Sequence, residues 1–224
     1  MSAHGDRIAG LQRHRNPDRP WYRYAYRLLP SEAGGHWLDL GCGQGELLDE
    51  ARRRGLRGMG LDVSRDNARA TRKSGASSLV ADLNRGLPFA DASLAGATLV
   101  EVIEHIIQAE TLVAELQRVI RPGGWLVVTT PNVVHWTYRL RALTGHPPKQ
   151  EGYHYRFFTK PLLKKVFSER GFIIREQGSF GKNALLTKLL RPARGRGYKF
   201  RYRMPDAAEG VLAQHFVWKL ERSD

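Results

Sequence analysis

The sequence contains one cysteine, Cys42, in 224 residues. This excludes a disulfide within the chain and a zinc site built from paired cysteines. No apolar run approaches the ~18 residues that a transmembrane helix needs, and residues 1–16 are charged and lack the apolar stretch of a secretory signal. These absences predict a reducing, cytoplasmic location. Hydrophobic residues make up 42% and charged residues 26% of the chain, which predicts one globular α/β domain with added segments.

Acidic residues are scarce relative to basic ones. There are 22 Asp and Glu against 36 Lys and Arg, which gives a formal net charge of +14. A basic excess can indicate nucleic acid, an anionic membrane surface or an acidic substrate, and it can also be a solvated surface. Residues 182–203 carry eight basic and no acidic residues. The excess of basic over acidic residues therefore lies mainly in the segments that flank the middle of the chain.

The composition divides the chain into two parts. Residues 1–30 form an N-terminal arm followed by an aromatic helix over residues 21–29, which we expect to pack over a sheet edge or a cofactor cleft. Aromatic residues interleaved with arginines can also stack on nucleic-acid bases. Residues 31–224 form the main domain, and residues 182–203 are a basic insert within it. Within that insert, residues 184–190 with the basic tail that follows them could rest on an anionic membrane.

A glycine-rich segment follows the first predicted strand. The residues Trp37-Leu38-Asp39-Leu40 lead into Gly41, Gly43 and Gly45, and a helical pattern starts at Glu46. Glycines at these positions let a ligand approach bare backbone at a helix N-terminus. A dinucleotide fingerprint would place its third glycine at position 46, and the Asp39 carboxylate would repel a pyrophosphate. The segment suits a ligand with an ammonium group, such as S-adenosylmethionine.

The segment Asp-Leu-Gly-Cys-Gly-Gln-Gly resembles the cofactor loop of class I S-adenosylmethionine-dependent methyltransferases. This resemblance implies a doubly wound α/β fold with a mostly parallel, seven-stranded sheet whose last strand enters antiparallel. It also implies S-adenosylmethionine as the cofactor. Asp39, Gly41 and Gly43 are then cofactor-binding residues.

Two more predicted strands end in an acid. Asp62 follows an apolar strand about twenty residues beyond the glycines, where an acid can accept bonds from both ribose hydroxyls. Asp82 and Leu83 follow the third strand, and the resemblance assigns them to the adenine. Val100 ends the fourth strand beside the cofactor. Each acid alone could cap a helix, but ligands bind at the carboxyl ends of parallel strands, so the three together predict a cofactor site.

The resemblance extends over about residues 35–180. Residues 86–93 match a loop of the methyltransferase pattern, and Arg-Pro-Gly-Gly at 121–124 precedes the fifth strand. Residues 131–145 resemble the methyltransferase group associated with methionine biosynthesis. Residues 154–159 resemble methyltransferases of the ubiquinone-pathway type. The arm and the basic insert lie outside this likeness.

Glu104 and His105, just past the fourth strand, are the predicted catalytic residues. A neutral imidazole can act as a base near physiological pH, and His135 and His154 are further candidates. In a helical turn Glu101, Glu104 and His105 would share one face and could hold a divalent ion, so the metal question stays open. The predicted acceptor pocket contains His135, Trp136, His154 and Arg156, the last meeting a carboxylate or phosphate.

The predicted function is methyl transfer from S-adenosylmethionine to a small molecule, with oxygen as the acceptor atom. The amino-group methylation motif D/N-P-P-Y/F/W is absent after the fourth strand, which disfavours a nucleic-acid methyltransferase. Three alternatives stay open: an RNA-directed methyltransferase that uses the basic flanks, a non-catalytic S-adenosylmethionine-binding module, and a nicotinamide-dependent reductase, which Asp39 and the glycine spacing oppose.

Overall fold

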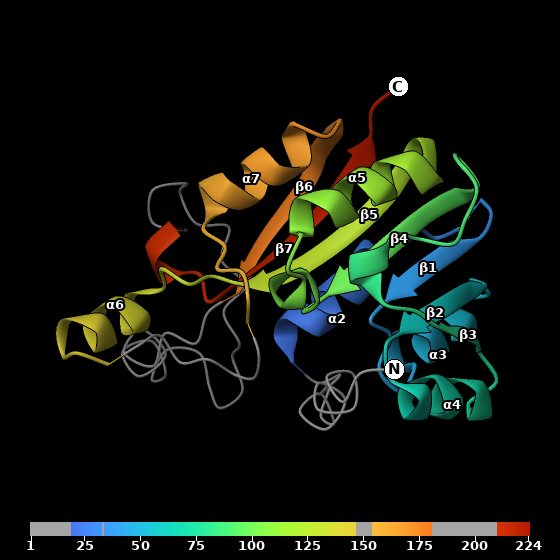
Figure 1. Cartoon of the computed structure of the whole chain (residues 1–224), viewed down its shortest axis with the longest axis horizontal. Helices are drawn as coiled ribbons and strands as arrows, with labels where there is room; N and C mark the ends of the chain where they lie inside the picture. Colours follow the sequence, from blue (N-terminus) through green and yellow to red (C-terminus); the bar gives the residue numbers. More distant parts are fainter. Residues whose placement is uncertain (1–18, 33, 147–153, 181–209) are drawn as a thin grey trace, which may run out of the picture.

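A seven-stranded sheet runs through the centre of the computed structural model (Figure 1), which describes residues 19–32, 34–146, 154–180 and 210–224. Its strand order is β3-β2-β1-β4-β5-β7-β6. All neighbours are parallel except β7, which is antiparallel to both β5 and β6. The strands are β1 (Trp37–Leu40), β2 (Gly58–Asp62), β3 (Ser77–Val80), β4 (Leu94–Val100), β5 (Ile120–Pro131), β6 (Phe172–Phe180) and β7 (His215–Arg222). The predicted doubly wound sheet with an antiparallel last strand is confirmed.

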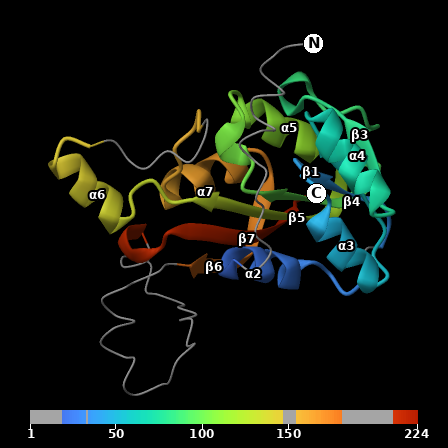
Figure 2. The same cartoon turned by 90° about the horizontal axis from the view of Figure 1, so that it is seen from below.

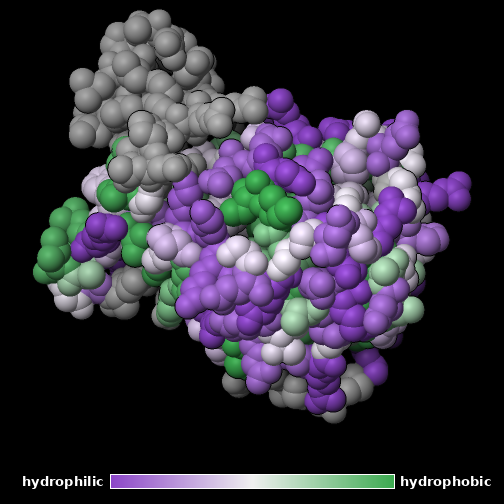
Figure 3. Space-filling view, turned by 90° about the horizontal axis from the view of Figure 1, so that it is seen from above, coloured by the Kyte–Doolittle hydropathy of each residue, from purple (hydrophilic) through white to green (hydrophobic). Residues whose placement is uncertain are grey.

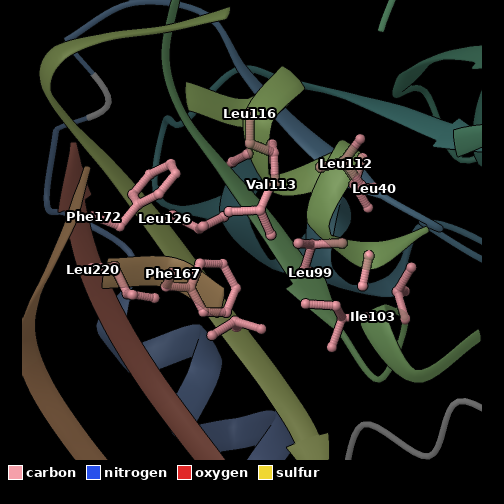
Figure 4. Packing of buried hydrophobic residues seen from close by; sticks show 14 of the residues in the cluster. Leu40, Leu99, Ile103, Leu112, Val113, Leu116, Leu126, Phe167, Phe172 and Leu220 are labelled. Carbon is pink, nitrogen blue, oxygen red and sulfur yellow. The ribbon is translucent and has the colours of Figure 1, made fainter. Parts of the chain in front are cut away.

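Helices cover both faces of this sheet (Figure 2). They are α2 (Pro20–Leu28), α3 (Glu46–Arg53), α4 (Arg65–Lys73), α5 (Ala109–Val119), α6 (Trp136–Leu143) and α7 (Lys160–Ser168), with short 3-10 turns η1 (Leu83–Arg85) and η2 (Ile103–His105). One buried cluster joins α5 and α7 to the sheet, and another joins α2 and α3 to its opposite face. In Figure 4, Leu112 and Leu116 of α5 and Phe167 of α7 belong to the first cluster.

The strand order reverses next to β1, because β2 lies on one side of it and β4 on the other. In an open parallel sheet this reversal leaves a ligand crevice outside the carboxyl ends of the strands. The loops after β1, β2, β3 and β4 therefore converge at one edge, which we call the carboxyl edge. It is where the predicted cofactor residues lie.

The N-terminal aromatic helix is confirmed as α2. Its buried side chains include Trp21, Tyr24 and Leu28, and it contacts β5, β6 and β7. Residues 1–18 of the predicted arm and the predicted basic insert at 182–203 lie outside the described residues. The fifth strand is longer than predicted: it begins at Ile120, because the chain pairs with Leu94 of β4 already before the Arg-Pro-Gly-Gly segment.

α6 stands apart from the sheet (Figures 1 and 2). None of its residues is buried, and Leu140 and Leu143 are 54% and 84% exposed. Figure 3 shows apolar side chains at this end of the molecule, on a face that is otherwise mostly hydrophilic. Across the described residues, no helix combines the length and the apolar character needed to cross a bilayer. Packing within the described part of the chain does not explain the bare apolar residues of α6.

The loop over residues 86–93 is held by an ion pair on α5. Glu115 accepts hydrogen bonds from the Leu87 amide (2.9 Å) and from Arg118, and Arg118 donates to the carbonyls of Leu87 and Phe89. The hydrogen bond from Arg118, with that from the Leu87 backbone, lowers the pKa of Glu115 to about 2. The residues of the methyltransferase-like loop are thus fixed to α5 by charge-assisted bonds.

We expect Glu115→Gln to lower the melting temperature by about 3 °C at pH 7, because the charge-assisted bonds are lost. A group with a depressed folded-state pKa stabilises the fold fully above its ordinary value and loses this effect as pH falls through the folded value. The difference between variant and wild type should therefore shrink as pH drops from about 4.5 towards 2. Calorimetry at several pH values measures this difference in melting temperature. Glu169→Gln, at an exposed position, is the control. A difference independent of pH would contradict the expectation.

Candidate functional site

The glycine loop joins β1 to α3 through left-handed backbone. Gly41, Gly43 and Gly45 have φ angles of 65°, 58° and 92°, which favour glycine over residues with a Cβ. A Cβ on Gly45 would meet Thr71 at 3.1 Å. Cys42 is fully buried, and its amide donates to the Leu61 carbonyl at 2.9 Å, so the loop is tied to β2. Cys42 packs in the buried cluster beneath the loop.

Asp62, the last residue of β2, holds this loop in place. Its Oδ2 accepts from the Gly43 amide at 2.9 Å, and its Oδ1 accepts from the Ser64 amide and from Asn67 Nδ2 at 2.8 and 3.2 Å. The side chain is buried, with the residue 2% exposed. A buried carboxylate with three donors fixes the distance between the glycine loop and the end of β2.

The other two predicted acids lie at the ends of the neighbouring strands. Asp39 is buried in β1, and its Oδ1 accepts from Thr98 Oγ1 on β4 at 2.7 Å. Asp82 follows β3 and accepts from the Asn84 amide at 3.0 Å, which caps the turn that starts at Leu83. Val100 ends β4 and is buried. The structure thus brings the predicted cofactor residues to one edge.

This edge fits S-adenosylmethionine. The left-handed glycines expose backbone where a ligand can approach closely, and the acids match a ligand whose methionine end carries an ammonium and a sulfonium charge. A dinucleotide would bring its pyrophosphate towards the Asp39 carboxylate instead. The residues that would hold the cofactor are Asp39, Gly41, Gly43, Asp62, Asp82, Leu83 and Val100.

Glu104, His105 and His154 come together beside the cofactor residues. Each offers one ligand atom, and these atoms lie within 4.8 Å of one another. Thr130 Oγ1 donates to Glu104 Oε2 at 3.1 Å, and the Glu104 carbonyl accepts from the amides of Tyr155 and Arg156. The predicted catalytic and acceptor segments, fifty residues apart in sequence, are therefore neighbours. One carboxylate and two imidazoles are also a donor set that a divalent transition metal accepts.

Glu101 does not join this group, contrary to the helical turn we considered from the sequence. Its φ angle is 55°, a left-handed value that is uncommon outside glycine. The backbone turns so that Glu101 Oε1 accepts from Thr129 Oγ1 at 2.6 Å and Oε2 lies 3.3 Å from His215 Nε2. In place of Glu101, His154 completes the group with Glu104 and His105.

The other predicted acceptor residues have separate surroundings. His135 is buried, and its Nδ1 lies 2.7 Å from Thr137 Oγ1. Burial, and then the charge of His215, lower the pKa of His135, so its imidazole is neutral at pH 7. Trp136 begins α6, with its ring 5.9 Å from that of His135. Arg156 pairs with Glu110 of α5, so an acidic acceptor would compete with this carboxylate.

Two residues of the site were not predicted from the sequence. His215 begins β7 opposite Pro131 at the end of β5, which brings it to the carboxyl edge. The Trp21 ring of α2 stacks on its imidazole with centroids 3.7 Å apart and an interplanar angle of 9°. A single histidine at the start of a late strand carries no motif, and only the strand order places it here.

Comparisons with known proteins identify the family of the chain. A family model described as a methyltransferase domain matches residues 11–177. A demethylmenaquinone methyltransferase of Beutenbergia cavernae is 30% identical over 91% of this chain and 81% of its own. A ubiquinone biosynthesis O-methyltransferase of Mesorhizobium japonicum is 33% identical over 42% of this chain and 40% of its own. An O-methyltransferase of Aspergillus sclerotiorum is 29% identical, and the chain spans 58% of its length.

Solved structures show the same fold. An S-adenosylmethionine-dependent methyltransferase from Mesorhizobium loti superposes with a TM-score of 0.65 at 18% identity, covering 92% of this chain and 99% of its own. The geranyl diphosphate C-methyltransferase of Streptomyces coelicolor, solved with S-adenosylhomocysteine, gives 0.63 at 15% identity, covering 99% and 98%. With the matching family model and the geometry of the carboxyl edge, they lead to one conclusion: this chain belongs to the class I S-adenosylmethionine-dependent methyltransferases.

Proposed function

We propose that this protein transfers a methyl group from S-adenosylmethionine to a hydroxyl oxygen of a small-molecule acceptor. The observation that carries the proposal is the meeting of Glu104, His105 and His154 at the carboxyl edge. β1 and β4 are paired with Leu40 opposite Leu99, so the chain that leads to these residues leaves the sheet next to the glycine loop. Acid–base groups and the cofactor loop therefore share one edge.

The names of two of these relatives support oxygen as the acceptor atom. The Aspergillus and Mesorhizobium japonicum proteins are both O-methyltransferases, and the second acts in ubiquinone biosynthesis. The chain spans only about half the length of such relatives. We take hydroxyl compounds as the test acceptors, with catechols and other phenols first.

We assign roles to the residues on this basis. When bound, the cofactor supplies an electrophilic methyl group, and the protein supplies orientation and a proton acceptor. Glu104 is fixed by Thr130 and by the backbone of residues 155 and 156. It can hold His105 against the acceptor hydroxyl. The acceptor itself would contact His135, Trp136, His154 and Arg156.

The test is a product assay with a matched histidine variant. Purified protein is incubated with S-adenosylmethionine and a panel of catechols, phenols, carboxylic acids and amines, and S-adenosylhomocysteine and methylated products are quantified. We expect an O-methylated product, and we expect His105→Ala to lower its rate by about 100-fold because an acid–base group is removed. The exposed His146→Ala serves as the control and should keep the wild-type rate.

Two outcomes would overturn the proposal. Methylation of RNA without any small-molecule product would favour the RNA-directed alternative. Binding of S-adenosylmethionine without product from any acceptor class would favour a non-catalytic binding module. Within the described residues, no contact or charge cluster favours the RNA reading, and residues 182–203 lie outside them.

A metal-assisted form of the same reaction is the second candidate, because His154 completes a donor set with Glu104 and His105. A divalent ion there would polarise the acceptor hydroxyl. The two forms differ in one experiment: dialysis against a chelator abolishes activity in the metal-assisted form and leaves it unchanged in the metal-free form. Titration with Co²⁺, followed by its visible absorption in wild type and in His154→Ala, reports binding at this group directly.

A further inference from the structure

The far half of α6 exposes large apolar side chains to water. All residues from 139 to 146 are exposed, and Leu140 and Leu143 are 54% and 84% exposed. The helix extends away from the sheet in both views (Figures 1 and 2). Apolar side chains gathered on a surface mark a contact with another molecule or with a membrane. Neither the cofactor site nor the roles proposed for Glu104 and His105 use these leucines.

The residues of α6 are arranged as an apolar stripe between two cations. Trp136, Leu140 and Leu143 are spaced at i, i+4 and i+7, which places them on one side of the helix. Successive residues are turned by about 100° around the axis, so Arg139 lies on one side of this stripe and Arg141 on the other. Long basic side chains can keep their charge in water while their stems lie along an apolar surface. Such a helix suits the boundary between lipid headgroups and acyl chains.

The apolar surface continues into the segment before α7. The Val133 amide donates to the Phe158 carbonyl at 3.2 Å, which joins this segment to the residues before α6. Exposure alternates along it, so that Tyr155 and Phe157 are 39% and 41% exposed while Phe158 is buried. Nine large apolar side chains are exposed in the described residues, and five of them belong to α6, to this segment or to α7: Leu140, Leu143, Tyr155, Phe157 and Leu162. The exposed apolar surface is therefore concentrated at this end of the molecule.

The charge at this end has one sign. Residues 131–146 and 154–168 contain no Asp or Glu. Their basic residues are Arg139, Arg141, Arg156, Lys160, Lys164 and Lys165. Two of these six cations pair with acids from outside the two stretches, Arg156 with Glu110 and Lys165 with Glu169. The surface around the exposed leucines therefore carries an excess of positive charge.

The combination of apolar and cationic side chains selects among the possible occupants. A nucleic acid would neutralise the cations but would leave Leu140 and Leu143 in water. A second copy that pressed the same face against this one would bring the same cations and no acid from these stretches to the contact. An anionic bilayer offers both complements, because its headgroups attract the basic side chains and its acyl chains accept the leucines.

We propose that α6 docks this protein on an anionic lipid bilayer. Leu140 and Leu143 enter the outer part of the acyl region, and Arg139 and Arg141 lie at the level of the headgroup phosphates. α6 has eight residues and spans about 12 Å, so this contact is peripheral. Because α6 begins directly after His135, docking holds the carboxyl edge close to the bilayer. The inference goes beyond the proposed function, since docking needs neither S-adenosylmethionine nor an acceptor.

The first test is sedimentation of the whole chain with vesicles. We expect binding to phosphatidylcholine vesicles that contain about 30% phosphatidylserine, and little binding to phosphatidylcholine alone. Leu140→Gln combined with Leu143→Gln should lower the affinity by about 100-fold, because each leucine moved from water into lipid contributes about tenfold or more. Ile173→Gln is the matched control. Ile173 is 44% exposed at the start of β6, at the opposite edge of the sheet, and its replacement should leave the affinity unchanged.

The contribution of charge is measured with the same vesicles. Arg141→Gln should lower the affinity by about fivefold, which is the effect of one basic side chain near an anionic surface. Arg69→Gln is the control, because Arg69 lies on α4 and its side chain is 69% exposed. Binding of wild type should weaken as NaCl is raised, since salt screens the attraction.

A fluorescent label reports the insertion directly. Cys42 is the one cysteine of the chain and is fully buried, so a cysteine introduced at the surface reacts selectively. An environment-sensitive fluorophore on Leu143→Cys should shift its emission to the blue when phosphatidylserine vesicles are added. The same fluorophore on Ile173→Cys should not shift. Emission from Leu143→Cys that stays unchanged with vesicle-bound protein would place α6 in water and overturn the inference.

The remaining outcomes also decide the question. A wild type that binds neither kind of vesicle overturns the inference, as does wild-type affinity in the double leucine variant, which would assign binding to another surface. A dimer that light scattering detects in wild type and not in the double variant would make a second copy the occupant. If thermal melting shows that the double variant is unfolded, Arg141→Gln and the label decide. Vesicle binding without any methylated product supports docking and contradicts the proposed function, and methylation without vesicle binding does the reverse.

Discussion

Replacing Asp62 with alanine should weaken the binding of S-adenosylmethionine by about 1000-fold. The Asp62 carboxylate accepts from the Gly43 amide, the Ser64 amide and Asn67, so its removal leaves three buried donors without their acceptor. Each such loss costs about 1–3 kcal/mol. The Gly43 amide belongs to the loop that we expect to approach the cofactor. A loss of about 4 kcal/mol in binding corresponds to the stated change.

Isothermal titration calorimetry measures this effect, with Asp66→Ala as the matched control. Asp66 lies four residues further on, in the first turn of α4, and its side chain is 91% exposed. We expect the control to bind like wild type. A folded Asp62→Ala protein whose dissociation constant lies within about threefold of wild type would refute the assignment. Thermal melting distinguishes lost binding from lost folding.

Replacing Gly96 with alanine should destabilise the sheet at its centre. Gly96 lies in β4 opposite Trp125 of β5. A Cβ there would lie 2.3 Å from the indole ring and 2.6 Å from the Trp125 carbonyl oxygen. Relieving this clash would require β4 and β5 to move apart, which would break the hydrogen bonds between them. We therefore expect a loss of about 3 kcal/mol or more in the free energy of unfolding. The melting temperature should fall by about 6–12 °C.

Two further measurements test whether the indole of Trp125 causes this loss of stability. Gly210→Ala is the control, because a Cβ at Gly210 meets nothing within 4 Å. In a Trp125→Ala background, the change at Gly96 should cost less, because the ring is gone while the carbonyl contact persists. Denaturant unfolding of wild type, of the two single variants Gly96→Ala and Trp125→Ala, and of the double variant gives the coupling energy between these two positions. Equal costs of the Gly96 change in both backgrounds would show that the indole is not the source of the strain.

The fold was predictable because its signals are local. Each of the first three strands is short and carries an acid at or just past its carboxyl end, and Asp39, Asp62 and Asp82 all lie at the predicted edge. The amphipathic pattern of α5 and the glycine turn after β1 likewise need only neighbouring residues. The antiparallel direction of the last strand followed from the family resemblance, and its place between β5 and β6 came only from the structure, since no periodicity in the sequence encodes the order of strands.

The acceptor side was only partly predictable because its contacts are long-range. Glu104, His105 and His154 were recognised from two motifs and do meet. Glu101 was grouped with the wrong partners, because its left-handed backbone breaks the helical spacing that we assumed. His215 was missed: it lies 114 positions after Glu101, and no motif surrounds it. The match to the methyltransferase family model also ends at residue 177, before β7.

The place of β7 also sets the order in which this protein can assemble during synthesis. β7 lies between β5 and β6 in the sheet, yet the ribosome makes it after both. While β7 is still inside the exit tunnel, β5 has an open edge and β6 has no strand to pair with. Pairings between distant segments form slowly and leave such edges prone to aggregation. A nascent chain that lacks β7 therefore carries a finished cofactor half and an unfinished acceptor half, and it is a natural client for chaperones.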